Sequence, residues 1–174
     1  AAVAGVDNSC AIVEQFVRCW GDGWWGVNGN ATTNDLGDGE FPVTQPAGIL
    51  SPGEYAVQVD LGERNGCVLL ESGRVRCWGV DEHGLMGYAA ISEDIGDDEF
   101  GHVAEAHVIG EQAAGGEAVA LTVGDTHACV LTEAGTVRCW GDNEAGQLGY
   151  GDTSMRGDEP GELDTLSDLP LLRP

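Results

Sequence analysis

The chain has 174 residues with 30 acidic side chains against seven arginines, so its formal net charge is −23 at pH 7. Proteins hold a nucleic-acid backbone or an anionic membrane surface through clustered Lys and Arg, so this charge excludes both as ligands. No apolar stretch approaches the ~18 residues that a membrane-spanning helix requires. The length suits one domain of ordinary size.

Three segments, residues 8–30, 65–88 and 127–150, share one pattern. Each carries two cysteines, then a Trp-Gly pair, then a glycine-rich turn. A three-fold internal repeat explains this pattern. We therefore expect a single array whose units span about 1–54, 55–116 and 117–174. The anchors of the pattern are Gly5, Gly62 and Gly124, each five residues before a cysteine, and Trp20, Trp78 and Trp140.

Each unit begins with alternating apolar residues, which predicts a half-buried β-strand. In the first unit this strand is expected over Ala2–Val6. In the other two units one face of the strand is expected to carry a triplet of apolar side chains. These triplets are Val57, Val59 and Leu61, and Val119, Leu121 and Val123.

A hairpin that carries both cysteines follows each first strand. In the second unit a three-residue turn over 71–73, with Gly73 in the left-handed position, places Cys67 opposite Cys77. The third unit does the same for its cysteines, and a two-residue turn at 14–15 does so in the first. All three pairs fall at non-hydrogen-bonded positions, where Cβ atoms approach closely enough for a disulfide. The predicted disulfides are Cys10–Cys19, Cys67–Cys77 and Cys129–Cys139.

A reducing compartment would favour metal binding by such paired cysteines. Zinc fits poorly, because eight or nine residues separate the two members of each pair, whereas zinc sites use two to four. The sequence also opens on Ala1 without an initiator Met, as expected after signal-peptide removal. Together these features predict a secreted or surface protein.

The tryptophan after each second cysteine is expected to pack against the neighbouring unit. The acidic loop that follows could offer oxygen ligands to Ca²⁺. Its spacing matches no EF-hand or nonapeptide loop, so a solvated acidic rim is the alternative, and no other cofactor is expected. The candidate ligands are Asp38, Glu40, Asp97, Asp98, Glu99, Asp158 and Glu159.

Three further features are candidates for contact with other molecules. Trp24 and Trp25 lie together in a turn and are expected either at an interface or packed beneath the loop. The apolar segment with Leu169, Leu171 and Leu172 is a second candidate interface. Asn30 begins a glycosylation sequon.

We expect no enzymatic activity, because the chain has no nucleophile elbow and no Walker loop. Carboxylate pairs of the kind that glycosidases use stay open, and nothing in the sequence distinguishes one such pair.

The pattern CVLxxxGxVRCWGDNxxGQLGYGD, preceded by a glycine five residues before the first cysteine, resembles the RCC1-type repeat. The resemblance is to the cysteine-paired version that is common in secreted bacterial proteins. It covers the whole chain and is weakest in the first unit, where Trp24 and Trp25 replace the usual polar turn. The resemblance implies an all-β fold of β-propeller blades, with one four-stranded antiparallel blade per repeat.

Three blades are fewer than the four that a closed propeller needs, so an incomplete propeller with two exposed blade faces is expected. Either the chain is a piece of a longer protein or several chains assemble, as a ring or as a filament. We therefore expect a non-enzymatic secreted protein that acts in protein–protein interaction and self-assembles. A ligand-binding module of a larger surface protein and an inhibitor of another enzyme stay open as alternatives.

Overall fold

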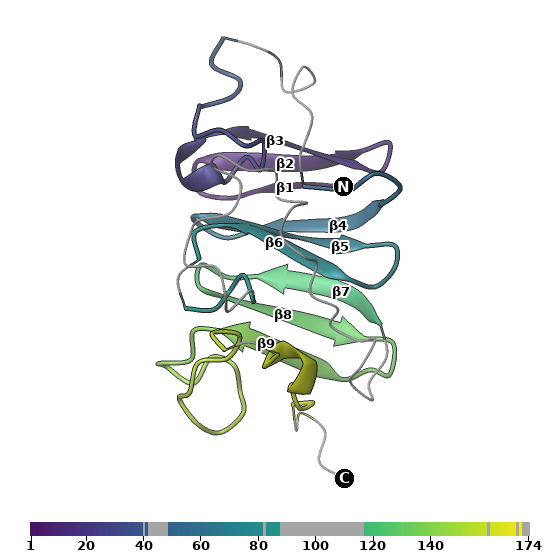
Figure 1. Cartoon of the computed structure of the whole chain (residues 1–174), viewed down its shortest axis with the longest axis vertical. Coiled ribbons are helices and arrows are strands. Elements are labelled where there is room, and N and C mark those ends of the chain that lie inside the picture. The colour runs from purple at the N-terminus through teal and green to yellow at the C-terminus, as the bar shows by residue number, and fades with distance from the viewer. Residues whose placement is uncertain are drawn as a thin grey trace.

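The computed structural model describes residues 1–39, 41, 49–81, 83–87, 117–159, 161–169 and 171. Three antiparallel three-stranded sheets lie one on the next in chain order (Figure 1). The described residues otherwise contain two short 3-10 helices, η1 (Trp24–Gly26) and η3 (Leu163–Thr165). The strands are β1 (Ala2–Ala4), β2 (Asn8–Val13) and β3 (Phe16–Gly21); β4 (Ala56–Leu61), β5 (Asn65–Leu70) and β6 (Val75–Gly79); and β7 (Ala118–Val123), β8 (His127–Thr132) and β9 (Val137–Gly141).

The hairpins have the predicted register. Cys67 lies opposite Cys77, and the backbone N–H of Leu70 donates to the Arg74 carbonyl (2.8 Å), which closes the three-residue turn. In the first sheet Glu14 and Gln15 both have positive φ (53° and 69°), as a two-residue turn matched to strand twist requires. The structure contains all three disulfides, each with a Cα–Cα distance of 4.1 Å.

The predicted face of the first strand is wrong at one position in each of two sheets. Val57 and Val119 are exposed, whereas Val59 and Leu121 are buried as expected. The register shifts between Ala56 and Gln58, and again at the equivalent position in β7. A β-bulge of this kind adds one residue to a strand, so the side chain at the bulge turns away from the face that the alternation predicts.

Two expectations about strand extent also need correction. The first strand ends at Ala4 rather than Val6. The described part of each blade has three strands rather than the four that the resemblance implied. At the place of a fourth strand, the first and third repeats have single β-bridges, Gly21 to Leu36 and Gly141 to Arg156.

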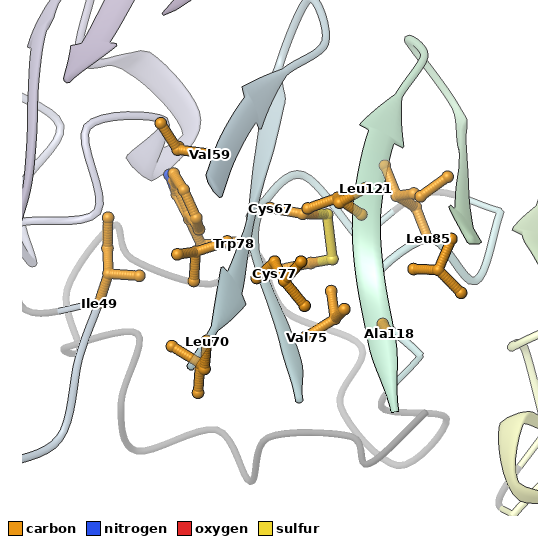
Figure 2. Packing of buried hydrophobic residues seen from close by; sticks show 14 of the residues in the cluster. Ile49, Val59, Cys67, Leu70, Val75, Cys77, Trp78, Leu85, Ala118 and Leu121 are labelled. Atoms are coloured by element: carbon orange, nitrogen blue, oxygen red, sulfur yellow. A yellow bond between two sulfur atoms is a disulfide. The ribbon is translucent and has the colours of Figure 1, made fainter. Parts of the chain in front are cut away.

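The core lies between the sheets, and the two faces of each sheet have different roles. Figure 2 shows Trp78 on one side of its sheet, near Ile49, and the Cys67–Cys77 disulfide on the other side, near Leu121. The indole Nε1 of Trp78 donates to the Val27 carbonyl of the preceding repeat (2.8 Å). In the second sheet, therefore, the tryptophan face meets the preceding repeat and the disulfide face meets the following one.

The glycine before the hairpin of the second repeat lies at a close approach of two neighbouring repeats. A Cβ atom added at Gly62 would lie 2.4 Å from the Gly124 carbonyl oxygen and 2.6 Å from Asn65 Oδ1. Only glycine fits between two backbones at that distance. The spacing of Gly5, Gly62 and Gly124 in the sequence thus reflects the stacking of the repeats.

Candidate interaction site at the two ends of the stack

Each internal junction joins the disulfide face of one repeat to the tryptophan face of the next. Between the first two repeats, Cys10, Val17 and Ile49 on one side and Leu70 and Trp78 on the other are all buried. A Cβ atom added to Gly29 would lie 2.5 Å from the Ile49 side chain and 3.4 Å from the Trp78 ring. Both side chains therefore pack beside this glycine. These contacts define which side chains a neighbouring repeat covers.

The first sheet presents its tryptophan face with no repeat against it among the described residues. Val13 is 55% exposed, although the equivalent Leu70 and Thr132 are buried. Phe16, which pairs with Val13 across the turn, is 50% exposed. Trp20 is only partly buried, whereas Trp78 is fully buried. We call Val13, Phe16 and Trp20 the leading face.

The third sheet presents its disulfide face in the same way. Leu131 is 40% exposed, although its equivalent Leu69 is buried. Cys129, Val137 and Leu169 are partly buried, and their equivalents Cys67, Val75 and Ile49 are buried. Leu169 corresponds to Ile49 because each packs against the equivalent turn glycine, Gly149 or Gly29. We call Cys129, Leu131, Val137 and Leu169 the trailing face.

Hydrogen bonds cross the two internal junctions at equivalent atoms. Trp140 Nε1 donates to the Leu85 carbonyl (2.8 Å), as Trp78 Nε1 does to Val27. The same repeat position in the third unit is Gln147, on the trailing side of the stack. A tryptophan from a following repeat would therefore meet the Gln147 carbonyl.

A second bond recurs at the start of each new sheet. The backbone N–H of Ala56 donates to the Gln15 carbonyl (3.0 Å), and that of Ala118 donates to the Gly73 carbonyl (3.3 Å). Both acceptors lie in the hairpin turn of the preceding repeat. The two internal junctions thus share one set of apolar contacts and hydrogen bonds, and a further repeat could form the same set.

Polar side chains strengthen the junction between the second and third sheets. Gln58 binds both backbone groups of Leu121, accepting from its N–H (2.9 Å) and donating to its carbonyl (2.5 Å). Asp60 Oδ2 accepts from the N–H of Val123 (2.8 Å). These side chains satisfy backbone groups on the edge of β7, which would otherwise be open to another strand.

The loop after β9 is held by one carboxylate. Asp152 accepts hydrogen bonds from Arg156 (3.1 and 2.9 Å), from the N–H of Ser154 (3.0 Å) and from Asn143 (3.1 Å). The Arg156 guanidinium also lies 4.1 Å above the Tyr150 ring. The bonds from Arg156, followed by that from Ser154, lower the pKa of Asp152 to about 2 from an ordinary value of 3.8.

We therefore expect the Asp152 carboxyl to titrate near pH 2 in a ¹³C NMR pH series. Because its pKa is lower in the folded than in the unfolded chain, its contribution to stability is present above pH 3.8 and is lost as pH falls through about 2. Arg156→Gln should raise the midpoint toward 3.8, while Glu159→Gln, which removes none of these bonds, should leave it low. A wild-type midpoint near the ordinary value would contradict this network.

The candidate metal ligands do not gather in the part of the chain that the structure describes. Asp38, Asp158 and Glu159 are exposed, and no group of three His, Cys, Asp or Glu side chains among the described residues could hold a metal ion. Four of the predicted ligands, Glu40, Asp97, Asp98 and Glu99, lie outside the described residues.

The other candidate residues occupy separate surfaces. Trp24 and Trp25 are both exposed on η1, so neither packs beneath the loop. Leu169 belongs to the trailing face and Leu171 is exposed, while Leu172 lies outside the described residues. Asn30 is half-buried and accepts a hydrogen bond from Thr32 Oγ1 (3.4 Å), and its glycosylation stays a prediction.

Sequence reasoning missed most of the end faces. The sequence pattern places Val13, Phe16 and Leu131 within hairpins without marking them as exposed, and it gives Ile49 no role. Comparison of equivalent positions could have found Val13, because an apolar side chain recurs there as Leu70. No described helix is long and apolar enough to cross a membrane.

Comparison with known proteins shows what these repeats are similar to. Residues 56–85 and 118–147 match the model of the regulator of chromosome condensation (RCC1) repeat. The chain is 30% identical over 145 residues to the human E3 ubiquitin-protein ligase HERC2, a match that spans 83% of this chain and 3% of that protein. It is also 30% identical over 152 residues to the ultraviolet-B receptor UVR8 of Arabidopsis thaliana, spanning 86% of this chain and 31% of the receptor.

Two solved structures share the fold. Human WBSCR16 superposes with a TM-score of 0.69 at 18% identity, over 98% of this chain and 37% of its own. Prp20p from Saccharomyces cerevisiae gives 0.68 at 12% identity, over 97% of this chain and 37% of its own. The chain thus spans well under half of each of these four proteins. Its three sheets are incomplete propeller blades, as predicted.

Proposed function

Because this chain is an array of RCC1-type repeats, we propose that it is a non-enzymatic protein-interaction module that self-assembles head to tail. The leading face of one copy binds the trailing face of the next. The observation that carries the proposal is the contrast at equivalent positions: Val13 and Leu131 are exposed at the ends, whereas Leu70 and Leu69 are buried inside. A heterologous joint of this kind extends as a ring or a filament.

Interaction with proteins fits what is described for similar proteins. Prp20p, which is yeast RCC1, has described binding properties toward Gsp1p and histones, and one structure contains it bound to Kap60. In this chain the positions that form the end faces are largely those that the internal junctions bury, which favours a second copy of the chain as the partner. Apart from Phe16, whose equivalents are Arg74 and Thr136, the residues of both faces occupy positions that are buried at the internal junctions.

We also propose that the protein works in an oxidising compartment, as a secreted or surface protein. Three disulfides, with every described cysteine paired, support this setting. High negative charge is compatible with an extracellular location but opposes self-association, because each copy repels the next. Salt screens that repulsion, so assembly should increase with ionic strength.

The test is the native mass measured by light scattering across a concentration series. We expect the wild-type mass to rise with concentration in multiples of the chain mass, and Val13→Asp to remain monomeric. Val119→Asp is the matched control, because this valine is exposed on the bulge of β7 and belongs to neither end face. The proposal fails if the wild type is monomeric at every concentration and ionic strength, or if both variants associate equally.

A further inference from the structure

Two exposed tryptophans form a surface that the end faces do not use. The side chains of Trp24 and Trp25 are 64% and 44% exposed, and their rings meet at 64° with centroids 6.4 Å apart. Residues of this size are normally covered in a monomer, so adjacent exposed indoles mark a binding surface. Neither residue belongs to the leading or the trailing face.

The turn that carries these rings is fixed by hydrogen bonds rather than loose. The N–H of Trp24 donates to Asp22 Oδ1 (2.9 Å), and that of Gly23 donates to Asp35 Oδ1 (3.0 Å). The turn continues into Val27, whose carbonyl accepts the bond from Trp78. The rings are therefore held outward on a backbone that the rest of the stack anchors.

The backbone at Trp25 is left-handed, with a φ of +64° that bulky residues rarely adopt. The equivalent residue of the second repeat, His83, has a φ of +63°, so the repeat's own turn imposes this conformation. Here it turns the second indole to the surface beside the first.

The charges around the turn favour a cationic ligand. Residues 19–63 contain no Lys, Arg or His, and the described part of the loop carries Asp22, Asp35 and Asp38. On the neighbouring strand β6, Arg76 is buried and paired with Glu54 (2.8 Å). The turn itself therefore carries negative charge from Asp22 and Asp35, which repels an anion and attracts a cation.

We propose that Trp24 and Trp25 form a docking site for an arginine or lysine side chain of a partner protein. The cation lies over an indole face, a contact that contributes about 0.5–1 kcal/mol at an exposed site and more when water is excluded. The carboxylates of Asp22 and Asp35, fixed within the turn by the bonds described above, supply the opposite charge. The partner is a basic segment, which the acidic surface as a whole also attracts.

The test is a ¹H–¹⁵N NMR titration of the wild-type protein that follows the five indole N–H signals. The probe is Nα-acetyl-arginine amide, and its uncharged isostere Nα-acetyl-citrulline amide is the ligand control. We expect the signals of Trp24 and Trp25, assigned with Trp24→Phe and Trp25→Phe, to shift with arginine several-fold more than with citrulline. Trp78 and Trp140, which are buried, serve as internal references.

Three results would overturn the proposal: equal shifts with citrulline, shifts spread over all five indoles, or shifts with cellobiose and none with arginine. The last would identify a glycan surface instead. Trp24→Ala combined with Trp25→Ala should abolish the arginine response and leave native mass and thermal unfolding unchanged. Because the readout is local to η1, failure here is independent of whether copies assemble end to end.

Discussion

Alanine in place of Trp78 is expected to lower the free energy of unfolding by about 3–5 kcal/mol. The indole is fully buried between the first two sheets, and its removal leaves both a cavity and an unpaired Val27 carbonyl. Domains of this size have a net stability of about 5–15 kcal/mol, so a large part of it would be lost. Urea unfolding followed by circular dichroism measures the change.

The matched control for Trp78 is Trp20→Ala, which makes the same substitution at the same repeat position. Its ring is only partly buried because no repeat covers the leading face, so its cost in stability should be clearly smaller. Its effect should appear in the native mass instead. Equal destabilisation by the two variants would show that the tryptophan does not act through the junction.

Gly62→Ala is expected to separate the second and third sheets locally. The new methyl group would lie 2.4 Å from the Gly124 carbonyl, a backbone atom that cannot move unless the neighbouring sheet does. Overpacking of this kind costs about 1–3 kcal/mol, and more where backbone must shift. Thermal unfolding measures the loss, and hydrogen exchange should locate it at the contact between β4 and β7.

Gly39→Ala provides the control for this position, because a Cβ atom there meets nothing within 4 Å. It should leave the unfolding temperature near that of the wild type. If Gly62→Ala were equally neutral, the close approach of the two backbones would be wrong. The stacking of the repeats would then need another explanation.

Local sequence signals were sufficient to predict the hairpins and disulfides within each blade. Turn length decides hairpin register, so the turns at 14–15 and 71–73 placed the cysteines opposite one another. The tryptophan repeat predicted packing between units because large side chains recur only where the same contact recurs. The resemblance to RCC1-type repeats then supplied the arrangement of sheets.

Features that depend on neighbouring segments were not predictable in this way. The bulges escaped detection because Val57 and Val119 continue an apolar alternation that the backbone breaks. Ile49 lies outside any periodic segment, so only its contact with Trp78 reveals its role. The end faces become visible when the exposure of Val13 is compared with that of Leu70.

The most direct test of head-to-tail binding mixes two variants, each blocked at one face. Val13→Asp removes the leading face and Leu131→Asp removes the trailing face, so each variant alone should be monomeric by light scattering. Mixed in equal amounts, they retain one intact face each and should form a 1:1 dimer and nothing larger. Absence of a dimer in the mixture, or association of either variant alone, would contradict the joint.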